Sequence, residues 1–278
     1  MRAAALKKEI ESSLGKVSDC AGFEANCLLQ HFCSLTLSDI YLDKEIDDVK
    51  TDALKEAVKK RCENYPLQYI LGNWEFMGYT FCVNENVLIP RPETELLCEC
   101  LSDKVSAESV VYDLCSGSGC VAISIHKNTG AKVYAFEKYD GAFSILEKNI
   151  NHNEAFGVEA LQCDITQKPT FELEKADFLF SNPPYIKTSE IASLQAEVQT
   201  EPHTALDGGK DGLDFYRAIH SNFIPFLKPG GFAAFEIGEG QLEAVKEIFS
   251  TLFFERSIKD YNGIERIVVF KNKAQKGN

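Results

Sequence analysis

The stretch "SVVYDLCSGSGCVAISIHKN", residues 109–128, contains the pattern that decides the fold. Residues 109–114 form a short apolar run, which favours a buried strand, and residues 119–128 have the apolar spacing of a helix. Between them, Asp113 opens a D-x-x-x-G-x-G turn that closes at Gly119. A strand that passes through glycines into a helix is typical of a sheet in which strands and helices alternate.

The rest of the chain after residue 109 repeats this alternation. Further strands are expected at 132–137, 158–164, 176–182, 230–238, 253–260 and 264–270, and further helices at 141–153, 212–227 and 241–250. The last two strands follow each other directly, which favours an antiparallel hairpin. We therefore expect an α/β fold with a doubly wound, mostly parallel, seven-stranded sheet that ends in an antiparallel hairpin.

The chain before residue 89 has a different character. Apolar residues at helical spacing predict helices at 6–14, 23–33, 37–42 and 46–62, so residues 1–65 are expected to form a small helical bundle. Residues 66–88 are aromatic, alternating and punctuated by glycine, which predicts a β-hairpin linker. Residues 89–278 then form the ligand-binding domain, and the polar tail 271–278 is expected to fray.

Composition narrows the class of protein. The formal net charge is -13 and the pI is near 4.9, which disfavours a stable complex with nucleic acid. A local basic patch inside an acidic total would still allow one. The ten cysteines form no C-x-x-C pair and the five histidines no H-E-x-x-H pattern, so we expect reduced thiols and no metal.

The surroundings of the protein are expected to be the cytoplasm. No apolar run approaches the ~20 residues of a membrane-spanning helix, and the N-terminus lacks the apolar centre of a secretory signal. This also predicts no membrane partner. A monomer is expected, because no extended apolar stripe is left without an element to cover it.

Three successive strand ends carry groups that suit a nucleoside. The glycines after Asp113 let a ligand approach the backbone, although a tight turn alone would explain them. Glu137 ends the second strand, where an acidic residue accepts hydrogen bonds from ribose hydroxyls, and a solvated carboxylate is the alternative. Asp164 ends the third and could meet an adenine amino group. With no phosphate-binding pattern, the three together suggest S-adenosylmethionine.

The fourth strand leads into "FSNPPYIKT", residues 180–188. Asn182 and Pro183 each precede a proline and are pushed toward extended geometry. The amide oxygen of Asn182 and the carbonyl of Pro183 can then face the cleft as two acceptors, followed by the aromatic face of Tyr185. Two acceptors and a flat surface suit alkylation of a planar NH2 group. The alternative is a Pro-Pro turn that only leaves the sheet.

These residues resemble class I S-adenosylmethionine-dependent methyltransferases that act on planar nitrogen. "PLQYILGNWEFMGYTFCVNENVLIPRPETE", "EPHTALDGGKDGLDFY", "LKPGGFAAFEIGEGQ" and "DYNGIERIVVF" are similar, in order and spacing, to bacterial release factor glutamine methyltransferases. The family departs from this chain at two positions, since it usually has glycine at Cys115 and aspartate at Glu137. The stretch "IPRPETE" is typical of the family and is expected at the rim of the cofactor cleft.

The resemblance implies a methyltransferase sheet and a reaction. A methyl group would pass from S-adenosylmethionine, leaving S-adenosylhomocysteine, to the amide nitrogen of glutamine in the Gly-Gly-Gln loop of class 1 peptide chain release factors, with residues 1–65 docking the release factor. The implied cofactor residues are Asp113, Cys115, Ser116, Gly117, Ser118, Gly119, Glu137, Asp164, Ile165 and Asn182. Substrate would be held by Asn182, Pro183, Pro184 and Tyr185, of which Asn182, Pro183 and Tyr185 are the expected catalytic residues.

Two other functions stay open on the residues alone. An enzyme that methylates the amino group of adenine (N6) or cytosine (N4) in nucleic acid would have the same substrate clamp, residues 182–185. Only the net charge opposes this alternative. A scaffold that binds the cofactor without chemistry is the other alternative, and the intact Asn182 and Tyr185 oppose it.

Overall fold

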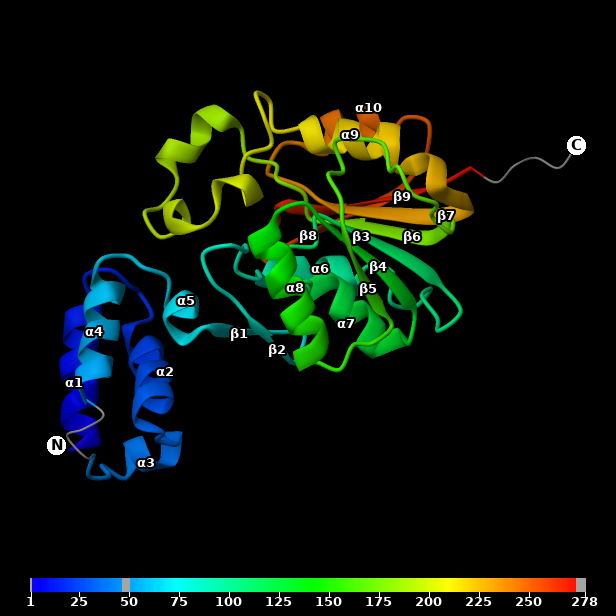
Figure 1. The fold of residues 1–278 in the computed structure, drawn as a ribbon. Helices are drawn as coiled ribbons and strands as arrows, with labels where there is room; N and C mark the ends of the chain where they lie inside the picture. The colour runs from blue at the N-terminus through cyan, green and yellow to red at the C-terminus, as the bar shows by residue number, and fades with distance from the viewer. Residues whose placement is uncertain (1, 47–50, 274–278) are drawn as a thin grey trace, which may run out of the picture. The chain divides into compact units, whose positions relative to one another are not determined.

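The chain forms two compact units in the computed structural model, which describes residues 2–46 and 51–273 (Figure 1). The first unit comprises Met1–Asn73 with Gln195–Thr200, and the second comprises Trp74–Leu194 with Glu201–Asn278. Residues 47–50 of the helix expected at 46–62, and residues 274–278 of the expected polar tail, lie outside the described residues.

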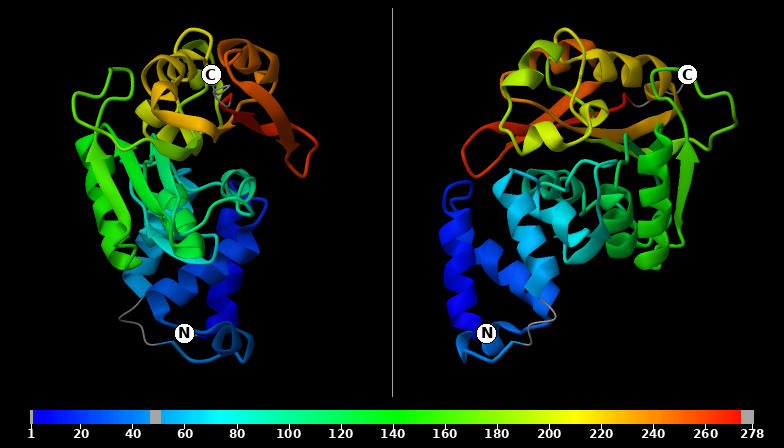
Figure 2. Two further views of the ribbon diagram at one scale, coloured as in Figure 1. Left: turned by 90° about the vertical axis from the view of Figure 1, so that its right-hand side faces the viewer. Right: turned by 60° about the vertical axis from the view of Figure 1, so that its left-hand side comes forward.

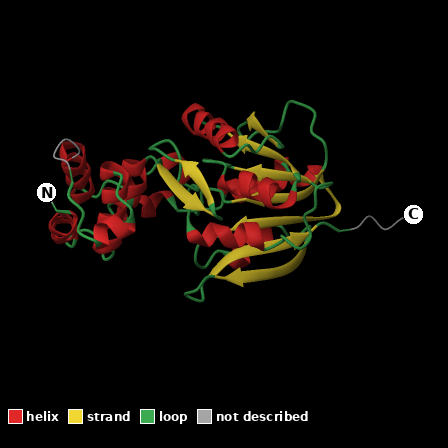
Figure 3. Ribbon diagram, turned by 90° about the horizontal axis from the view of Figure 1, so that it is seen from below, coloured by secondary structure: helices red, strands yellow, loops and turns green. Residues whose placement is uncertain are grey.

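The first unit is helical, as expected from its sequence (Figure 3). Its helices are α1 (Ala3–Leu14), α2 (Ala21–Cys33), α3 (Leu37–Tyr41), α4 (Thr51–Cys62) and α5 (Leu67–Leu71). On α1 the buried residues Leu6, Ile10 and Leu14 recur every four positions, so one stripe of the helix packs inward.

Helix α5 corrects the prediction that residues 66–88 form a hairpin throughout. Pro66 precedes the helix and Gly72 ends it in the left-handed region, with φ of 72°. A rigid residue at the start and a glycine at the end are sufficient to define one short helix. The hairpin follows it as β1 (Asn73–Phe76) and β2 (Tyr79–Cys82).

The second unit contains a seven-stranded sheet, as predicted. Its strands are β3 (Val110–Leu114), β4 (Lys132–Glu137), β5 (Val158–Gln162), β6 (Ala176–Ser181), β7 (Leu227–Glu236), β8 (Phe253–Lys259) and β9 (Glu265–Lys271). Their order is β5-β4-β3-β6-β7-β9-β8, and β9 runs antiparallel to both β7 and β8 while the other neighbours are parallel. The chain reverses its direction of winding between β3 and β6, which is where open sheets bind ligands.

Helices cover both faces of this sheet (Figures 1 and 2). Helices α6 (Pro92–Glu99), α7 (Cys120–Thr129) and α8 (Asp140–His152) lie on one face, and α9 (Asp214–Asn222) and α10 (Leu242–Ile248) on the other. Side chains of β3 alternate between the two cores, since Val111 packs with the first group and Tyr112 with the second. Short 3-10 helices span Thr188–Ser193, Val198–Thr200, His203–Ala205 and Ile224–Phe226.

Several expected boundaries were wrong. The helix expected at 212–227 ends at Asn222, and β7 begins at Leu227 rather than at residue 230, because a separate 3-10 turn that contains Pro225, Ile224–Phe226, lies between them. The strand expected at 158–164 ends at Gln162, because the Asp164 carboxylate accepts the backbone N–H of Thr166 and forms a turn. No helix within the described part of the chain is long and apolar enough to cross a membrane.

Candidate active site

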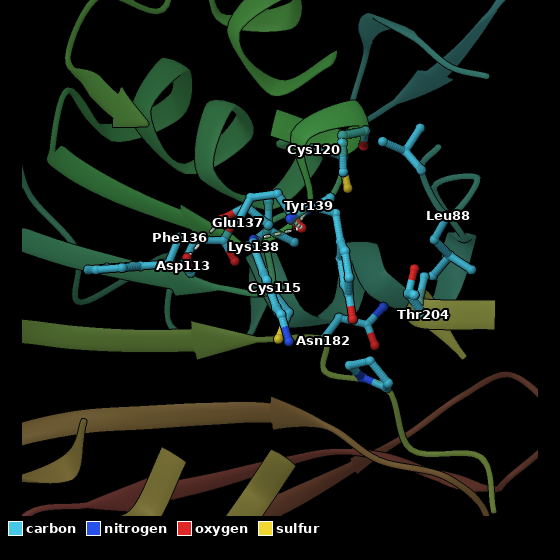
Figure 4. A pocket seen from close by; sticks show the side chains of 18 of the residues that line it. Leu88, Asp113, Cys115, Cys120, Phe136, Glu137, Lys138, Tyr139, Asn182 and Thr204 are labelled. Atoms are coloured by element: carbon cyan, nitrogen blue, oxygen red, sulfur yellow. Dashed lines mark hydrogen bonds between the residues drawn. The ribbon is translucent and has the colours of Figure 1, made fainter. Parts of the chain in front are cut away.

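A pocket of about 890 Å³, including space open to solvent, lies in the second unit at the carboxyl ends of β3, β4 and β6 (Figure 4). Of the residues proposed from sequence, it is lined by Asp113, Cys115, Ser116, Gly117, Ser118, Glu137, Asp164, Ile165, Asn182 and Pro184. The other three, Gly119, Pro183 and Tyr185, are not among the residues that line it.

The glycine turn after β3 uses its two glycines differently. At Gly117, φ is 53° and a Cβ atom would meet no heavy atom within 4 Å, so the backbone faces open space. At Gly119, φ is 80° and a Cβ atom would lie 2.5 Å from Cδ1 of Leu146. Gly117 therefore leaves room for a ligand, whereas Gly119 lets α7 pack against α8.

Side chains on neighbouring elements fix the shape of this turn. The Ser116 hydroxyl donates to the Asp113 carbonyl at 2.8 Å. The fully buried Asn149 of α8 donates to the Ser118 carbonyl at 2.8 Å, and its amide oxygen accepts the backbone N–H of Cys82 in β2 at 2.7 Å. The hairpin, α8 and the turn are thus joined through one amide, which the sequence pattern of α8 did not reveal.

Glu137, the last residue of β4, is buried at the wall of the pocket. One of its carboxylate oxygens accepts the N–H of Gly117 at 2.9 Å, and the other accepts the N–H groups of Lys138 and Tyr139 at 2.8 and 2.9 Å. A carboxylate offers about four acceptor positions, so about one remains for a ligand hydroxyl. The residue therefore both closes the turn and presents an acceptor to the pocket.

Asp113 is the second acidic group in the pocket and is almost wholly buried. Its side chain accepts the N–H of Ala122 at 3.2 Å. Burial, which penalises the charged form, raises the pKa of Asp113 to about 7, and the hydrogen bond from the N–H of Ala122 opposes that rise. An ammonium or other cationic group of a ligand would lower this pKa and be attracted in turn.

The far side of the pocket is formed after β5. The Asp164 carboxylate accepts from the N–H and the hydroxyl of Thr166 and pairs with Lys138 at 2.9 Å. These hydrogen bonds outweigh desolvation and lower the pKa of Asp164. Ile165 is buried beside it, and Asn222 of α9 donates to the Ile165 carbonyl at 3.1 Å. This side therefore combines a fixed negative charge with an apolar surface.

Asn182 and Pro183 follow β6, and Asn182 lines the same pocket. The side-chain NH2 of Asn182 donates to the Thr94 hydroxyl at 3.1 Å, and that hydroxyl donates to the Glu236 carboxylate at 2.7 Å. Within the described residues, neither the amide oxygen of Asn182 nor the carbonyl of Pro183 accepts a hydrogen bond. Of the two acceptors expected from the sequence, Asn182 lines the pocket, whereas Pro183 is buried and does not line it.

Tyr185 is half-buried, and its hydroxyl donates to Glu236 at 3.3 Å. Burial raises the pKa of this phenol well above its ordinary value. The main-chain carbonyl of Tyr185 accepts a hydrogen bond from the side-chain NH2 of Gln241 at 2.9 Å. A Cβ atom on Gly208 would lie 2.7 Å from the Pro184 carbonyl, and one on Gly212 would lie 2.3 Å from the Tyr185 carbonyl. The main chain at Gly208 and Gly212 therefore packs directly against the main chain of Pro184 and Tyr185 and restricts its movement.

Several lining residues were missed or left without a role by the sequence reasoning. Thr94 and Arg91 of the "IPRPETE" stretch line the pocket, and Arg91 pairs with the buried Glu201. The spacing gave no sign that Thr94 would meet Asn182. An apolar wall comes from Val87, Leu88, Pro90, Phe136 and Phe215. Residues from loops so far apart in the chain have no shared periodicity by which to find them.

The groups present fit S-adenosylmethionine. The open space at Gly117, the acceptor on Glu137 and the apolar surface near Ile165 suit a nucleoside, and the buried Asp113 suits a cationic tail. No group of three His, Cys, Asp or Glu residues in ranges 2–46 and 51–273 is arranged to hold a metal ion.

Comparison with known proteins extends over almost the whole chain. Residues 5–72 match the PrmC N-terminal domain, and residues 92–209 match the Methyltransferase small domain. A solved methyltransferase from Pyrococcus furiosus has 20% identity and a TM-score of 0.53, with 69% of this chain and 88% of that one covered. At this identity the likeness supports the fold alone.

Full-length relatives are more similar. The release factor glutamine methyltransferase of Geobacter sulfurreducens is 37% identical over 89% of this chain and 88% of its own. That of Moorella thermoacetica is 38% identical over 87% of this chain and 88% of its own. The matches span both units, and so the chain belongs to the family of release factor glutamine methyltransferases.

Proposed function

We propose that this protein transfers a methyl group from S-adenosylmethionine to the side-chain amide nitrogen of the glutamine in the Gly-Gly-Gln motif of class 1 peptide chain release factors. The observation that supports this most directly is that the Asn182 amide oxygen accepts no hydrogen bond from the described residues and that Asn182 lines the pocket, with the Pro183 carbonyl, likewise without a described partner, next to it in the chain. Membership of the family supports the same substrate.

S-adenosylmethionine, when bound, supplies an electrophilic methyl group on a sulfonium. We assign its ribose to Glu137, its adenine to Asp164 and Ile165, and its methionine part to the turn from Cys115 to Gly119. Gly117 leaves open space above the backbone, and burial raises the pKa of Asp113, as a site awaiting a cationic partner requires. Asn182 borders both the cofactor pocket and the position assigned to the glutamine.

The acceptors would act on the electronic state of the substrate nitrogen. An amide nitrogen shares its lone pair with the carbonyl, as the barrier of ~18–20 kcal/mol to rotation shows. If Asn182 and Pro183 accept both N–H hydrogens, the nitrogen is oriented with its lone pair toward the methyl group. In this reaction the nitrogen would gain the methyl group, the sulfonium would leave as the neutral thioether S-adenosylhomocysteine, and one N–H proton would be released to solvent. Tyr185 is assigned to the face of the substrate amide.

The first unit is assigned to docking of the release factor. Residues 1–65 would hold the body of the partner while its Gly-Gly-Gln loop enters the second unit. A monomer is sufficient for this, since every residue assigned to the site belongs to one chain.

Mass spectrometry of an unmethylated release factor tests the proposal. With S-adenosylmethionine, the Gly-Gly-Gln peptide should gain the mass of one methyl group, and Asn182→Ala should slow the transfer by at least about 100-fold, as for loss of one preorganised polar contact. Asn151→Ala is a matched control, because Asn151 is exposed on α8 and, among the described residues, its side-chain amide bonds only the Glu147 carbonyl of the same helix.

The alternatives give different results. A DNA duplex in a parallel reaction should remain unmethylated, and methylation of the duplex instead of the release factor would contradict the proposal. A scaffold would bind both S-adenosylmethionine and the release factor without any transfer, and this outcome would also contradict it.

A further inference from the structure

Glu236 lies next to the clamp because of the register of the sheet. Ser181 at the end of β6 pairs with Phe235 of β7, so the next residues, Asn182 and Glu236, leave neighbouring strands at the same edge. The Glu236 side chain is buried, with only 3% of the residue exposed. It is not among the residues that line the pocket, so its influence on a ligand must pass through its neighbours.

The direction of each hydrogen bond follows from the chemistry of the groups. An ionised carboxylate only accepts, so the single proton of the Thr94 hydroxyl is donated to Glu236. The Thr94 oxygen is then left to accept, and only the NH2 of the Asn182 amide can donate to it. The amide oxygen of Asn182 must therefore point away from Thr94.

We propose that Glu236 and Thr94 are positioning residues that fix which end of the Asn182 amide faces the substrate. This inference rests on the function proposed above, and it adds the reason why Asn182 presents an acceptor rather than a donor. The same carboxylate accepts from the Tyr185 hydroxyl at 3.3 Å. One buried side chain thus orients both ends of the clamp.

Binding of one proton to Glu236 would reverse these hydrogen-bond directions. A neutral Glu236 can donate to Thr94, whose hydroxyl is then free to donate to the amide oxygen of Asn182. The amide would turn over and present its NH2 group, which cannot accept the substrate N–H. The ionised form of Glu236 is therefore the active one.

The groups around Glu236 determine the pH at which its carboxyl group loses this proton. Burial raises the pKa of Glu236 to about 7, Thr94 and Tyr185 oppose this by hydrogen bonding, Arg266 of β9 lowers it, and Glu93 of α6 raises it. Cys120 of α7 and Tyr216 of α9 also lie within electrostatic reach. The turnover rate should accordingly increase as pH rises through about 7 when the cofactor is saturating.

Substitutions at Thr94 test the contribution of its hydroxyl group separately from that of its side-chain volume. Thr94→Val removes the relay at nearly equal volume and should lower kcat about tenfold or more, with the dissociation constant for S-adenosylmethionine changed less than about threefold. Thr94→Ser keeps the hydroxyl and should stay within about threefold of the parent. Glu236→Gln should remove the rise of kcat with pH.

Tyr216→Phe is the control for disturbance at Glu236. It deletes a hydroxyl that donates to the main-chain carbonyl of Glu236 at 2.7 Å and leaves the carboxylate contacts intact. Its melting temperature is compared directly with that of Thr94→Val, and its kcat well above pH 7, where Glu236 is ionised in both proteins, should equal that of the parent. A kcat of Thr94→Val equal to that of the parent would overturn the proposal.

A second readout does not depend on catalysis. In protein labelled with 15N-asparagine, one side-chain amide proton of Asn182 should be protected from exchange, and Thr94→Val but not Thr94→Ser should remove this protection. Unchanged protection in Thr94→Val would also overturn the proposal. If the parent protein transfers no methyl group to a release factor, the proposed function fails, while the exchange comparison still decides the role of Thr94.

Discussion

At the scale of single residues, the turn after β3 places three residues in the left-handed region, Cys115 at φ of 61°, Gly117 at 53° and Gly119 at 80°. A non-glycine residue in this region costs roughly 1–2 kcal/mol. Cys115 bears that cost while its side chain packs beside the second core and lines the pocket. The turn is thus held in a conformation that its own sequence only partly favours, and Glu137 and Asn149 stabilise it.

The open space at Gly117 makes a testable prediction about cofactor binding. Gly117→Ala would place a methyl group where no protein atom lies within 4 Å, which is the space assigned to the cofactor. We expect affinity for S-adenosylmethionine, measured by calorimetry, to fall at least about tenfold, equivalent to about 1.4 kcal/mol.

Gly263→Ala is the matched control for backbone strain. Gly263 also has positive φ, 79°, with no atom within 4 Å of a Cβ position, but it lies in the turn between β8 and β9 and away from the pocket. Both variants should lose roughly 1 kcal/mol of stability. Equal affinities for S-adenosylmethionine in the two variants would contradict the assigned cofactor position.

At the scale of elements, the alternation of strand and helix predicted the sheet, its seven strands and its terminal hairpin. It also placed Asp113, Glu137 and Asp164 at one edge, because the carboxyl ends of parallel strands meet there. The strand predicted at 158–164 ends at Gln162, because a turn closed by the Asp164 side chain replaces the hydrogen bonds that would continue the strand. The contact from Thr94 to Asn182 joins residues 88 positions apart, and periodicity carries no information about such pairs.

The elements of the first unit are joined through one buried cation. Arg61 of α4 pairs with Glu24 of α2 at 2.7 Å and with Glu197 at 2.9 Å, which ties residues 195–200 to this unit. The side chain of Arg61 is 3% exposed and that of Glu24 is 10% exposed. Removing Arg61 would therefore leave a carboxylate buried without its cation, a situation that costs about 3–5 kcal/mol.

Hydrogen exchange of the backbone amides in α2 and α4 tests this pairing. Arg61→Ala should lower the free energy of opening by about 3–5 kcal/mol in both helices. Lys55→Ala is the control on the same helix, because Lys55 pairs with Asp52 at the surface, and it should change protection little. Similar protection in the two variants would show that the buried pair does not hold the helices together.

At the scale of the whole molecule, acidic residues outnumber basic ones, and some of the carboxyl groups are buried in the core. The chain carries a net charge of -13, and the second unit buries Asp113 and Glu236 without a directly paired cation among the described residues. Both groups have a pKa raised by burial to about 7, from ordinary values of 3.8 and 4.5. Of the four carboxyl groups that we assign to function, the folded state thus resists the ionisation of Asp113 and Glu236, whereas the pKa of Asp164 is lowered.

Stability of the second unit should consequently fall as pH rises from about 5 to about 8. The folded state binds more protons than the unfolded state in this window, so the stability contributed by the raised pKa values is present below about 4 and is lost through about 7. The expected loss is on the order of 5 kcal/mol. Carboxyl groups with lowered pKa, such as Asp211 at about 2, titrate below this window and do not offset it.

Urea denaturation followed through Trp74, the single tryptophan, measures this effect because Trp74 belongs to the second unit. The double variant Asp113→Asn with Glu236→Gln should flatten the pH dependence, since neither amide titrates. Stability that rises over the same range in the parent would contradict the burial of these charges. If the fall is observed, the pH at which Glu236 ionises and orients Asn182 is also the pH at which it destabilises the fold, so activity and stability oppose each other at one carboxylate.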